Sequence, residues 1–251
     1  MERAMQGSAG RGTDHIGGPR PARFLSSLSG PVREELLSIG SPQKYPPGEK
    51  ILVEGAPGDY LVLLRTGCVK VTGRLGNGHD ALIGIRVGGD VVGEMAVIEG
   101  APRSATVTAC EDIDAHVVQG RAMRSFLDKW PEAAIQIARL SNRRERTANS
   151  WRIAFSAFPA RVRLARALVE LAENHGRLVR TYGRPARSYT LICVNLTHIE
   201  LAGLIGARQG TVQKTLATFR AEGIVATANR RMEVFKLDRL RAIGLLPAIG
   251  R

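Results

Sequence analysis

Residues 92–107 read VGEMAVIEGAPRSATV, a mostly small and apolar segment that carries two acidic side chains and one basic side chain among glycines. Gly93 has no side chain, so backbone N–H groups there can approach a ligand closely. Arg103 offers a planar fork suited to phosphate and Ser104 adds a hydroxyl donor, while Glu94 can accept from a sugar hydroxyl. The segment predicts a site for a nucleoside phosphate. The alternative is a sharp turn in which Arg103 and Glu94 simply pair with each other.

The region around this segment consists of short β-like runs separated by turn residues. These runs are residues 50–53, 60–64, 69–72, 81–85 and 105–109, and the breaks are residues 55–59, 76–78 and 88–90. Many short strands at regular spacing predict an antiparallel β-roll or jelly roll. Residues 24–40 show helical spacing instead, with Pro31 in the first turn.

The segment from Gly93-Glu94 to residues 102–106 (PRSAT) resembles the phosphate-binding cassette of cyclic-nucleotide-binding domains in residue type and spacing. The order of strands and glycines from Tyr45 to this cassette is similar to that domain as well. The resemblance implies a cyclic nucleotide, cAMP or cGMP, as effector, with no metal. The effector-binding residues that it implies are Gly93, Glu94, Met95, Arg103 and Ser104.

A long helix is predicted from Pro131 to about Phe158. Its steps of three and four residues form the seam of a two-stranded coiled coil, made of Ala134, Ile137, Ser141, Arg144, Ala148, Trp151, Phe155 and Phe158. The alternative is a helix packed on its own β-roll, because two polar residues interrupt the seam. In the resembling family this helix is the dimer interface and passes the ligand, which implies that Asn149 reaches the ligand of the partner subunit. Ala148 replaces the hydroxyl residue found in cAMP sensors, so the sequence leaves the base open.

Residues 197–219 have the pattern of a helix-turn-helix. Thr197 and Glu200 form a capping box, Gly206 permits a left-handed turn, and Val212 and Leu216 belong to the apolar wedge between the helices. The alternative is an ordinary helical hairpin, but wing-like strands on either side of residues 229–231 favour a winged form. We predict that the second helix enters a major groove and that the DNA-binding residues are Thr197, Arg208, Gln209, Gly210, Thr211 and Lys214.

The charge is divided unevenly along the chain. Residues 131–251 hold twenty-one basic and eight acidic side chains, whereas residues 24–130 hold eleven and thirteen. A nearly neutral N-terminal half and a strongly basic C-terminal half indicate that one domain faces a polyanion, with double-stranded DNA as the first candidate.

Together these motifs resemble the CRP/FNR family of transcription regulators over roughly residues 24–240. The resemblance implies an α+β fold and a homodimeric, cytoplasmic regulator that binds DNA and works with RNA polymerase. The expected parts are a disordered tail (1–23), an antiparallel β-roll sensor (24–130), a dimerisation helix (131–158) and a winged helix-turn-helix (159–251), with a hinge at residues 156–159. Arg208, Gln209 and Gly210 depart from the usual start of the recognition helix, so we expect a different operator.

Other functions have less support. The five histidines lie far apart and the sequence shows no Ser–His–Asp order or metal-ligand spacing, so we expect no enzyme. Three scattered cysteines cannot supply the four ligands of an iron–sulfur sensor. Two alternatives to cyclic-nucleotide gating stay open. The sensor pocket is vestigial or binds another effector, or the chain is a cyclic-nucleotide-binding module that acts on a protein partner.

Overall fold

The computed structural model describes residues 23–74, 76, 80–181, 187–192, 194–228 and 231–247. Several sequence predictions lie outside these ranges: the disordered tail up to residue 22, most of the turn at 76–78, Cys193, and the tip of the wing at 229–230. Arg23, which was assigned to the tail, is described and forms an ion pair with Asp90 at 3.8 Å. None of the helices in the described ranges could cross a membrane.

The N-terminal half forms two four-stranded antiparallel sheets. One has the order β1-β8-β3-β6 and the other β2-β7-β4-β5. Their bounds are β1 (Ser41–Tyr45), β2 (Lys50–Leu52), β3 (Tyr60–Leu64), β4 (Cys68–Arg74), β5 (Asp80–Val87), β6 (Val91–Val92), β7 (Thr106–Ala109) and β8 (Ile113–Gln119). An apolar core that includes Val62, Leu64, Val69 and Val71 fills the space between them. The expected antiparallel β-roll is confirmed.

Successive side chains of β3 point to opposite faces of the sheet, and both faces are buried. Val62 and Leu64 point into the roll, while Leu61 and Leu63 contact helices on its outer face. These helices are α1 (Gly30–Ser38), α3 (Gly120–Lys129) and the start of α4 (Pro131–Ala157), preceded by the short 3-10 helix η1 (Leu25–Ser27). One further helix, α2 (Glu94–Glu99), lies inside the cassette and was not predicted from the sequence.

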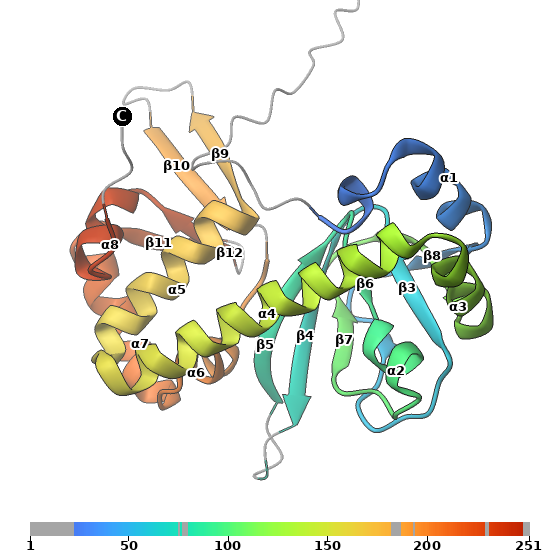
Figure 1. The fold of residues 1–251 in the computed structure, drawn as a ribbon. Coiled ribbons are helices and arrows are strands. Elements are labelled where there is room, and N and C mark those ends of the chain that lie inside the picture. The colour runs from blue at the N-terminus through green and yellow to red at the C-terminus, as the bar shows by residue number, and fades with distance from the viewer. Residues whose placement is uncertain are drawn as a thin grey trace, which may run out of the picture.

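Helix α4 crosses the front of the molecule from the roll to the C-terminal half (Figure 1). The predicted dimer seam is wrong for three of its residues, which face their own chain. Ile137 is 4% exposed in the core of the roll, Arg144 forms an ion pair with Glu94, and Trp151 packs against the C-terminal core. The chain's own domains therefore cover part of the predicted seam, while Ala134, Ser141, Ala148 and Phe155 are exposed.

The C-terminal half is a winged helix-turn-helix. Its elements are α5 (Ala160–His175), β9 (Gly176–Thr181), β10 (Arg187–Ile192), α6 (His198–Ile205), α7 (Gln209–Ala221), β11 (Val225–Ala228), β12 (Arg231–Val234) and α8 (Leu237–Ile243). The four strands form one sheet in the order β11-β12-β10-β9. The break between α4 and α5, at Phe158-Pro159, falls where the sequence predicted a hinge.

The two halves pack directly on each other through α6 and the edge strand β5. Cys68 and Ile85 of the roll join the apolar core of the C-terminal domain. Gly203 of α6 allows this close approach, because a Cβ there would lie 3.1 Å from the Cβ of Ala81. Lys70 of β4 and Glu200 of α6 form an ion pair at 2.8 Å across the same interface.

Candidate functional site

Arg103 lies at the centre of the cassette and is 4% exposed. Its Nη1 donates to the carbonyl of Gly93 at 3.1 Å, and its guanidinium lies over the ring of Tyr60, 4.4 Å from the centroid. Its buried Nη2 has no hydrogen-bond partner among the described residues. A buried donor without a partner carries a desolvation cost that an anionic ligand oxygen would remove.

Two glycines make room for this guanidinium. A Cβ at Gly58 would lie 2.8 Å from Nη2 of Arg103, and one at Gly93 would lie 2.8 Å from Nη1. Gly93 also has a φ of +82°, a conformation that residues with a side chain rarely adopt. The cassette therefore needs glycine at Gly93 for its backbone and for the placement of Arg103.

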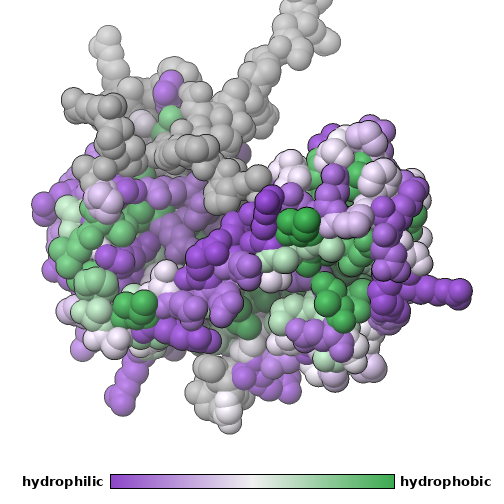
Figure 2. Space-filling view, in the orientation of Figure 1, coloured by the Kyte–Doolittle hydropathy of each residue, from purple (hydrophilic) through white to green (hydrophobic). Residues whose placement is uncertain are grey.

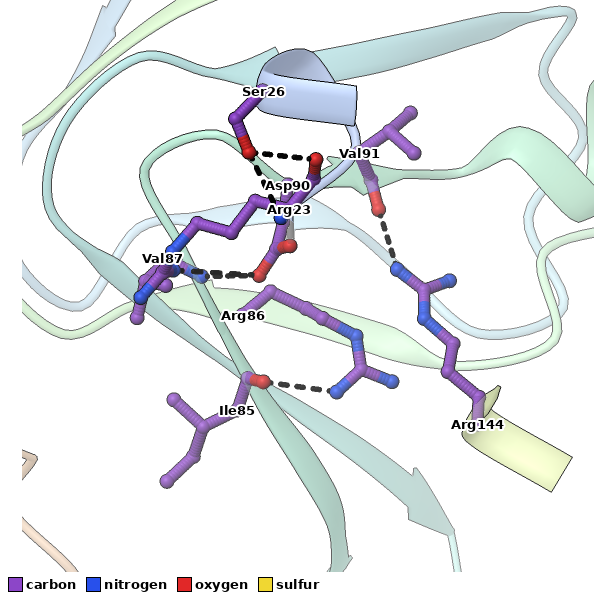
Figure 3. Close-up of polar contacts among 8 residues, drawn as sticks. All are labelled: Arg23, Ser26, Ile85, Arg86, Val87, Asp90, Val91 and Arg144. Atoms are coloured by element: carbon purple, nitrogen blue, oxygen red, sulfur yellow. Dashed lines mark hydrogen bonds and ion pairs between the residues drawn. The ribbon is translucent and has the colours of Figure 1, made fainter. Parts of the chain in front are cut away.

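Glu94 is 3% exposed and pairs with Arg144 of α4. Nη2 of Arg144 also donates to the carbonyl of Val91 at 2.8 Å (Figure 3). The alternative in which Glu94 pairs with Arg103 is therefore wrong. The sequence did not reveal the pair with Arg144, because it joins the roll to a helix fifty residues away.

A cavity of about 550 Å³ lies between the cassette and α4. Arg103, Glu94 and Gly93 line it on the cassette side, and Ala148 and Arg144 line it on the helix side. Met95 and Ser104 lie at its exposed rim, with Oγ of Ser104 3.7 Å from Sδ of Met95. The structure brings five of the six predicted effector residues together.

Asn149, the sixth, is exposed on α4 and does not line this cavity. Its Oδ1 accepts from Arg152 at 2.9 Å. A role for Asn149 therefore depends on a second subunit.

Arg86 of β5 lines the cavity as well, and sequence reasoning missed it. Nη1 donates to the carbonyl of Ile85 at 2.9 Å. Burial lowers the pKa of Arg86 to about 10, and the nearby charge of Arg144 adds to this effect. One signal was available in the sequence, because Arg86 is the single charge in the run between Asp80 and Asp90.

The helix-turn-helix has the predicted local geometry. The backbone N–H of Glu200 donates to Oγ1 of Thr197 at 3.1 Å, and that of Thr197 donates to Oε2 of Glu200 at 2.7 Å. Gly206 has a φ of +59°. Val212 and Leu216 of α7 are fully buried, whereas Arg208, Gln209, Gly210, Thr211 and Lys214, at the N-cap and in the first turns of the helix, are exposed. Thr197 lies apart from these residues, at the start of α6.

One arginine links the break after α4 to the turn of the helix-turn-helix. The guanidinium of Arg163 donates to the carbonyl of Phe158 at 2.7 Å and to that of Phe155 at 2.9 Å. It also donates to the carbonyls of Ile205 at 2.7 Å and Gly206 at 3.0 Å. A shift of the end of α4 would therefore be transmitted to the turn that positions α7.

Comparisons with known proteins agree with both sites. Residues 42–129 match the family model of the cyclic nucleotide-binding domain, and residues 162–243 match that of the Crp-like helix-turn-helix domain. The transcriptional regulator LdrP of Thermus thermophilus is 31% identical over 192 residues, which cover 76% of this chain and 91% of LdrP. The chain belongs to the CRP/FNR family of transcription regulators.

Two further relatives span most of this regulator. A CRP-like cAMP-activated global transcriptional regulator of Mycobacterium tuberculosis is 29% identical over 201 residues, covering 79% of this chain and 86% of the relative. The crystal structure of a CRP-family transcriptional regulator from Thermus thermophilus has a TM-score of 0.66 and 27% identity, covering 83% of this chain and 98% of that chain. This regulator is a ligand-responsive, DNA-binding protein with a cyclic nucleotide-binding domain.

Proposed function

We propose that this regulator is a homodimer that binds a cyclic nucleotide in the cavity between the cassette and α4 and, in response, binds a specific DNA site in the cytoplasm. The observation that carries the proposal is Arg103, a buried guanidinium with an unpartnered Nη2 at the wall of a cavity of about 550 Å³. A cyclic phosphate supplies the acceptor and the negative charge that this group requires.

The cassette residues fit such an effector in chemistry. Arg103 and Ser104 would hold the phosphate, and the backbone at Gly93 would approach it closely. Glu94 keeps an acceptor for a ribose hydroxyl beside its pair with Arg144. Met95 would cover the rim, and Asn149 would reach the ligand of a second subunit. The described residues contain no group of three His, Cys, Asp or Glu side chains placed to hold a metal.

The route from effector to DNA follows the contacts of α4. Glu94 connects the cassette to α4 through Arg144. Arg163 then connects the end of α4 to the turn before α7. A ligand that shifts the cassette would therefore bias the position of the recognition helix, and RNA polymerase would meet the complex on DNA.

The exposed N-terminal end of α7 supports direct contact with bases. Gln209 can bond an adenine edge through two hydrogen bonds, Lys214 can reach a guanine or a phosphate, and Arg208 can contact phosphate. Thr211 is exposed at the same end of α7, Gly210 has open space around it, and Thr197 at the start of α6 would lie near the DNA backbone.

Thermodynamic linkage tests this proposal. A duplex is first selected from random sequence, and its affinity is measured with and without cAMP and cGMP. We expect at least one nucleotide to change the DNA affinity, and the duplex to change the affinity for that nucleotide by the same factor. DNA binding that responds to neither nucleotide would support a vestigial pocket or another effector. Nucleotide binding without DNA binding would support a module for a protein partner.

A further inference from the structure

Arg86 is a cation in the effector cavity whose hydrogen-bonding capacity is largely unused. A guanidinium has five N–H donors. Among the described residues, Arg86 uses one of them, for the carbonyl of Ile85. Figure 3 shows Arg86 of β5 and Arg144 of α4 entering the same space from opposite sides.

Both carboxylates near Arg86 are engaged elsewhere. Asp90 pairs with Arg23 at 3.8 Å and accepts from the backbone N–H of Val87 at 3.0 Å. Glu94 pairs with Arg144. Arg86 is therefore a half-buried cation without an ion pair in the described part of the chain, and its remaining donors are free to meet acceptors of a ligand in the cavity.

Arg86 lies on the part of the cavity wall that borders a second cavity. A second cavity, of about 500 Å³, adjoins the first and shares Ile83, Arg86, Arg144 and Ala148 with it. Arg103 and Ser104 line only the first cavity. A cyclic nucleotide with its phosphate on Arg103 and its ribose at Glu94 would extend its base toward Arg86 and Ala148.

The base that best matches this wall is guanine. Ala148 presents a methyl group, which forms no hydrogen bond and therefore does not distinguish one purine edge from another. A guanidinium fork matches guanine, whose O6 and N7 are adjacent acceptors. Adenine presents an N6 amino group in place of O6, which opposes the donors of Arg86.

We propose that Arg86 contacts the O6–N7 edge of the bound base and makes this regulator select a guanine cyclic nucleotide over an adenine one. This inference rests on the proposed function, because it requires a cyclic nucleotide in the cavity. It adds a residue that determines effector specificity.

Gly84 gives a way to move Arg86 without removing its charge. A Cβ at Gly84 would lie 2.7 Å from Nη1 of Arg86. Because Nη1 is the end of a flexible side chain, Gly84→Ala should displace the guanidinium and leave the strand intact.

Calorimetric titration of the full chain with cGMP, cIMP and cAMP tests the assignment. cIMP keeps O6 and N7 but lacks the exocyclic amino group of guanine, so it separates this edge from the rest of the base. We expect wild type to bind cGMP and cIMP alike, and both about 5- to 150-fold more tightly than cAMP. Arg86→Leu and Gly84→Ala should abolish this preference, and Arg86→Lys should keep only part of it. Thermal unfolding of each variant verifies that it folds.

The possible failures separate the two proposals. Absence of binding of all three nucleotides to folded wild type removes the proposed function, and this inference with it. Binding with a preference for cAMP, or a guanine preference that Arg86→Leu leaves unchanged, overturns the assignment of Arg86 alone. Tight binding of cGMP but not cIMP would move recognition to the amino group of guanine and also overturn it.

Discussion

Two arginines of the cavity, Arg144 and Arg103, differ in their charged and hydrogen-bonding partners. Arg144 pairs with a carboxylate, whereas Arg103 has a carbonyl and an aromatic face but no ion pair, and each has one buried nitrogen without a partner among the described residues. We expect Arg103→Ala to weaken cyclic-nucleotide binding by roughly tenfold to several hundredfold, because a charge-assisted pair contributes a few kcal/mol at 1.4 kcal/mol per decade. Arg103→Lys should recover part of the loss. Arg121→Ala, at an exposed position of α3, is the calorimetric control, and equal affinity of wild type and Arg103→Ala would contradict the phosphate role.

Glu94 is expected to contribute both to nucleotide binding and to the coupling between the nucleotide site and the DNA-binding helices. Its pair with Arg144 joins the cassette to α4. Glu94→Gln should cost less nucleotide affinity than Arg103→Ala, because the amide still accepts from a ribose hydroxyl. It should reduce the effect of nucleotide on DNA affinity severalfold, because the ion pair is lost, and Arg144→Gln should do the same. Unchanged linkage in both variants, measured by fluorescence anisotropy with labelled duplex, would show that coupling follows another route.

At the scale of elements, α6 is held against the roll by an ion pair as well as by apolar packing. Lys70 and Glu200 are 17% and 16% exposed, so their pair is mostly shielded from water. Lys70→Gln leaves Glu200 without its cation and should destabilise the protein by about 1–3 kcal/mol. We expect faster hydrogen exchange in α6 as a result.

An exposed pair provides the control. Lys44 and Asp114 lie 3.6 Å apart at 88% and 55% exposure, so Lys44→Gln should have almost no effect on stability. Equal urea midpoints for the two variants would show that the contact of α6 with β5 does not depend on Lys70.

The sequence predicted most elements because their signals are local. Turn residues separate the strands, and β3 has the predicted bounds, Tyr60–Leu64. The contact of α6 with β5 could not be predicted in this way, because it joins distant segments and shows no periodicity of its own. The prediction of a dimer seam in α4 was wrong in part for a related reason. A repeat of three and four residues shows that a face is buried but not which surface covers it.

The residues of the candidate site also differ in whether a local sequence pattern could predict them. The cassette residues are close in sequence, so their types and spacing were sufficient to select Gly93, Glu94 and Arg103. Arg86 lies outside the cassette motif, and its being the single charge of its strand did not show that β5 would place it on the cavity wall.

At the scale of the whole molecule, α4 keeps one face that its own chain does not cover. The exposed positions Ile135, Ala138, Asn142, Glu145, Asn149 and Ile153 repeat at three or four residues. Ile135 is 52% and Ile153 67% exposed. Figure 2 shows a mainly hydrophilic strip along the middle of this helix with apolar patches toward its ends. We propose this face, in place of the seam expected from sequence, as the surface for a second subunit.

We therefore expect Ile153→Glu to give monomers at micromolar concentration in light scattering, because it places two charges in the apolar end of the interface. Ile98→Glu changes an isoleucine of α2 that is 53% exposed and should leave the dimer intact. Trp151→Glu is unsuitable, because Trp151 packs against its own C-terminal core. A monomeric wild type would contradict the dimer.

A dimer also determines the form of the DNA site. Two recognition helices related by a two-fold axis should select a symmetric sequence with half-sites about 10 base pairs apart. Binding should weaken steeply with salt, because the C-terminal half carries the excess of basic side chains and displaces counterions from phosphate.

Substitutions at the DNA-facing surface should then separate by role. Gln209 is exposed at the start of α7, so Gln209→Ala should relax the preference at one base pair in each half-site at a cost of about 1–3 kcal/mol. Arg231 begins β12 of the wing and Arg230 precedes it in the sequence, so replacing either by Ala should weaken binding to all sequences alike and flatten the salt slope. Selection from random duplexes followed by salt titration of each variant measures both effects. A two-fold dimer presents two identical recognition helices, so it should select a symmetric motif. If selection recovers no symmetric motif, with or without cyclic nucleotide, the proposed binding of two recognition helices to one DNA site is wrong.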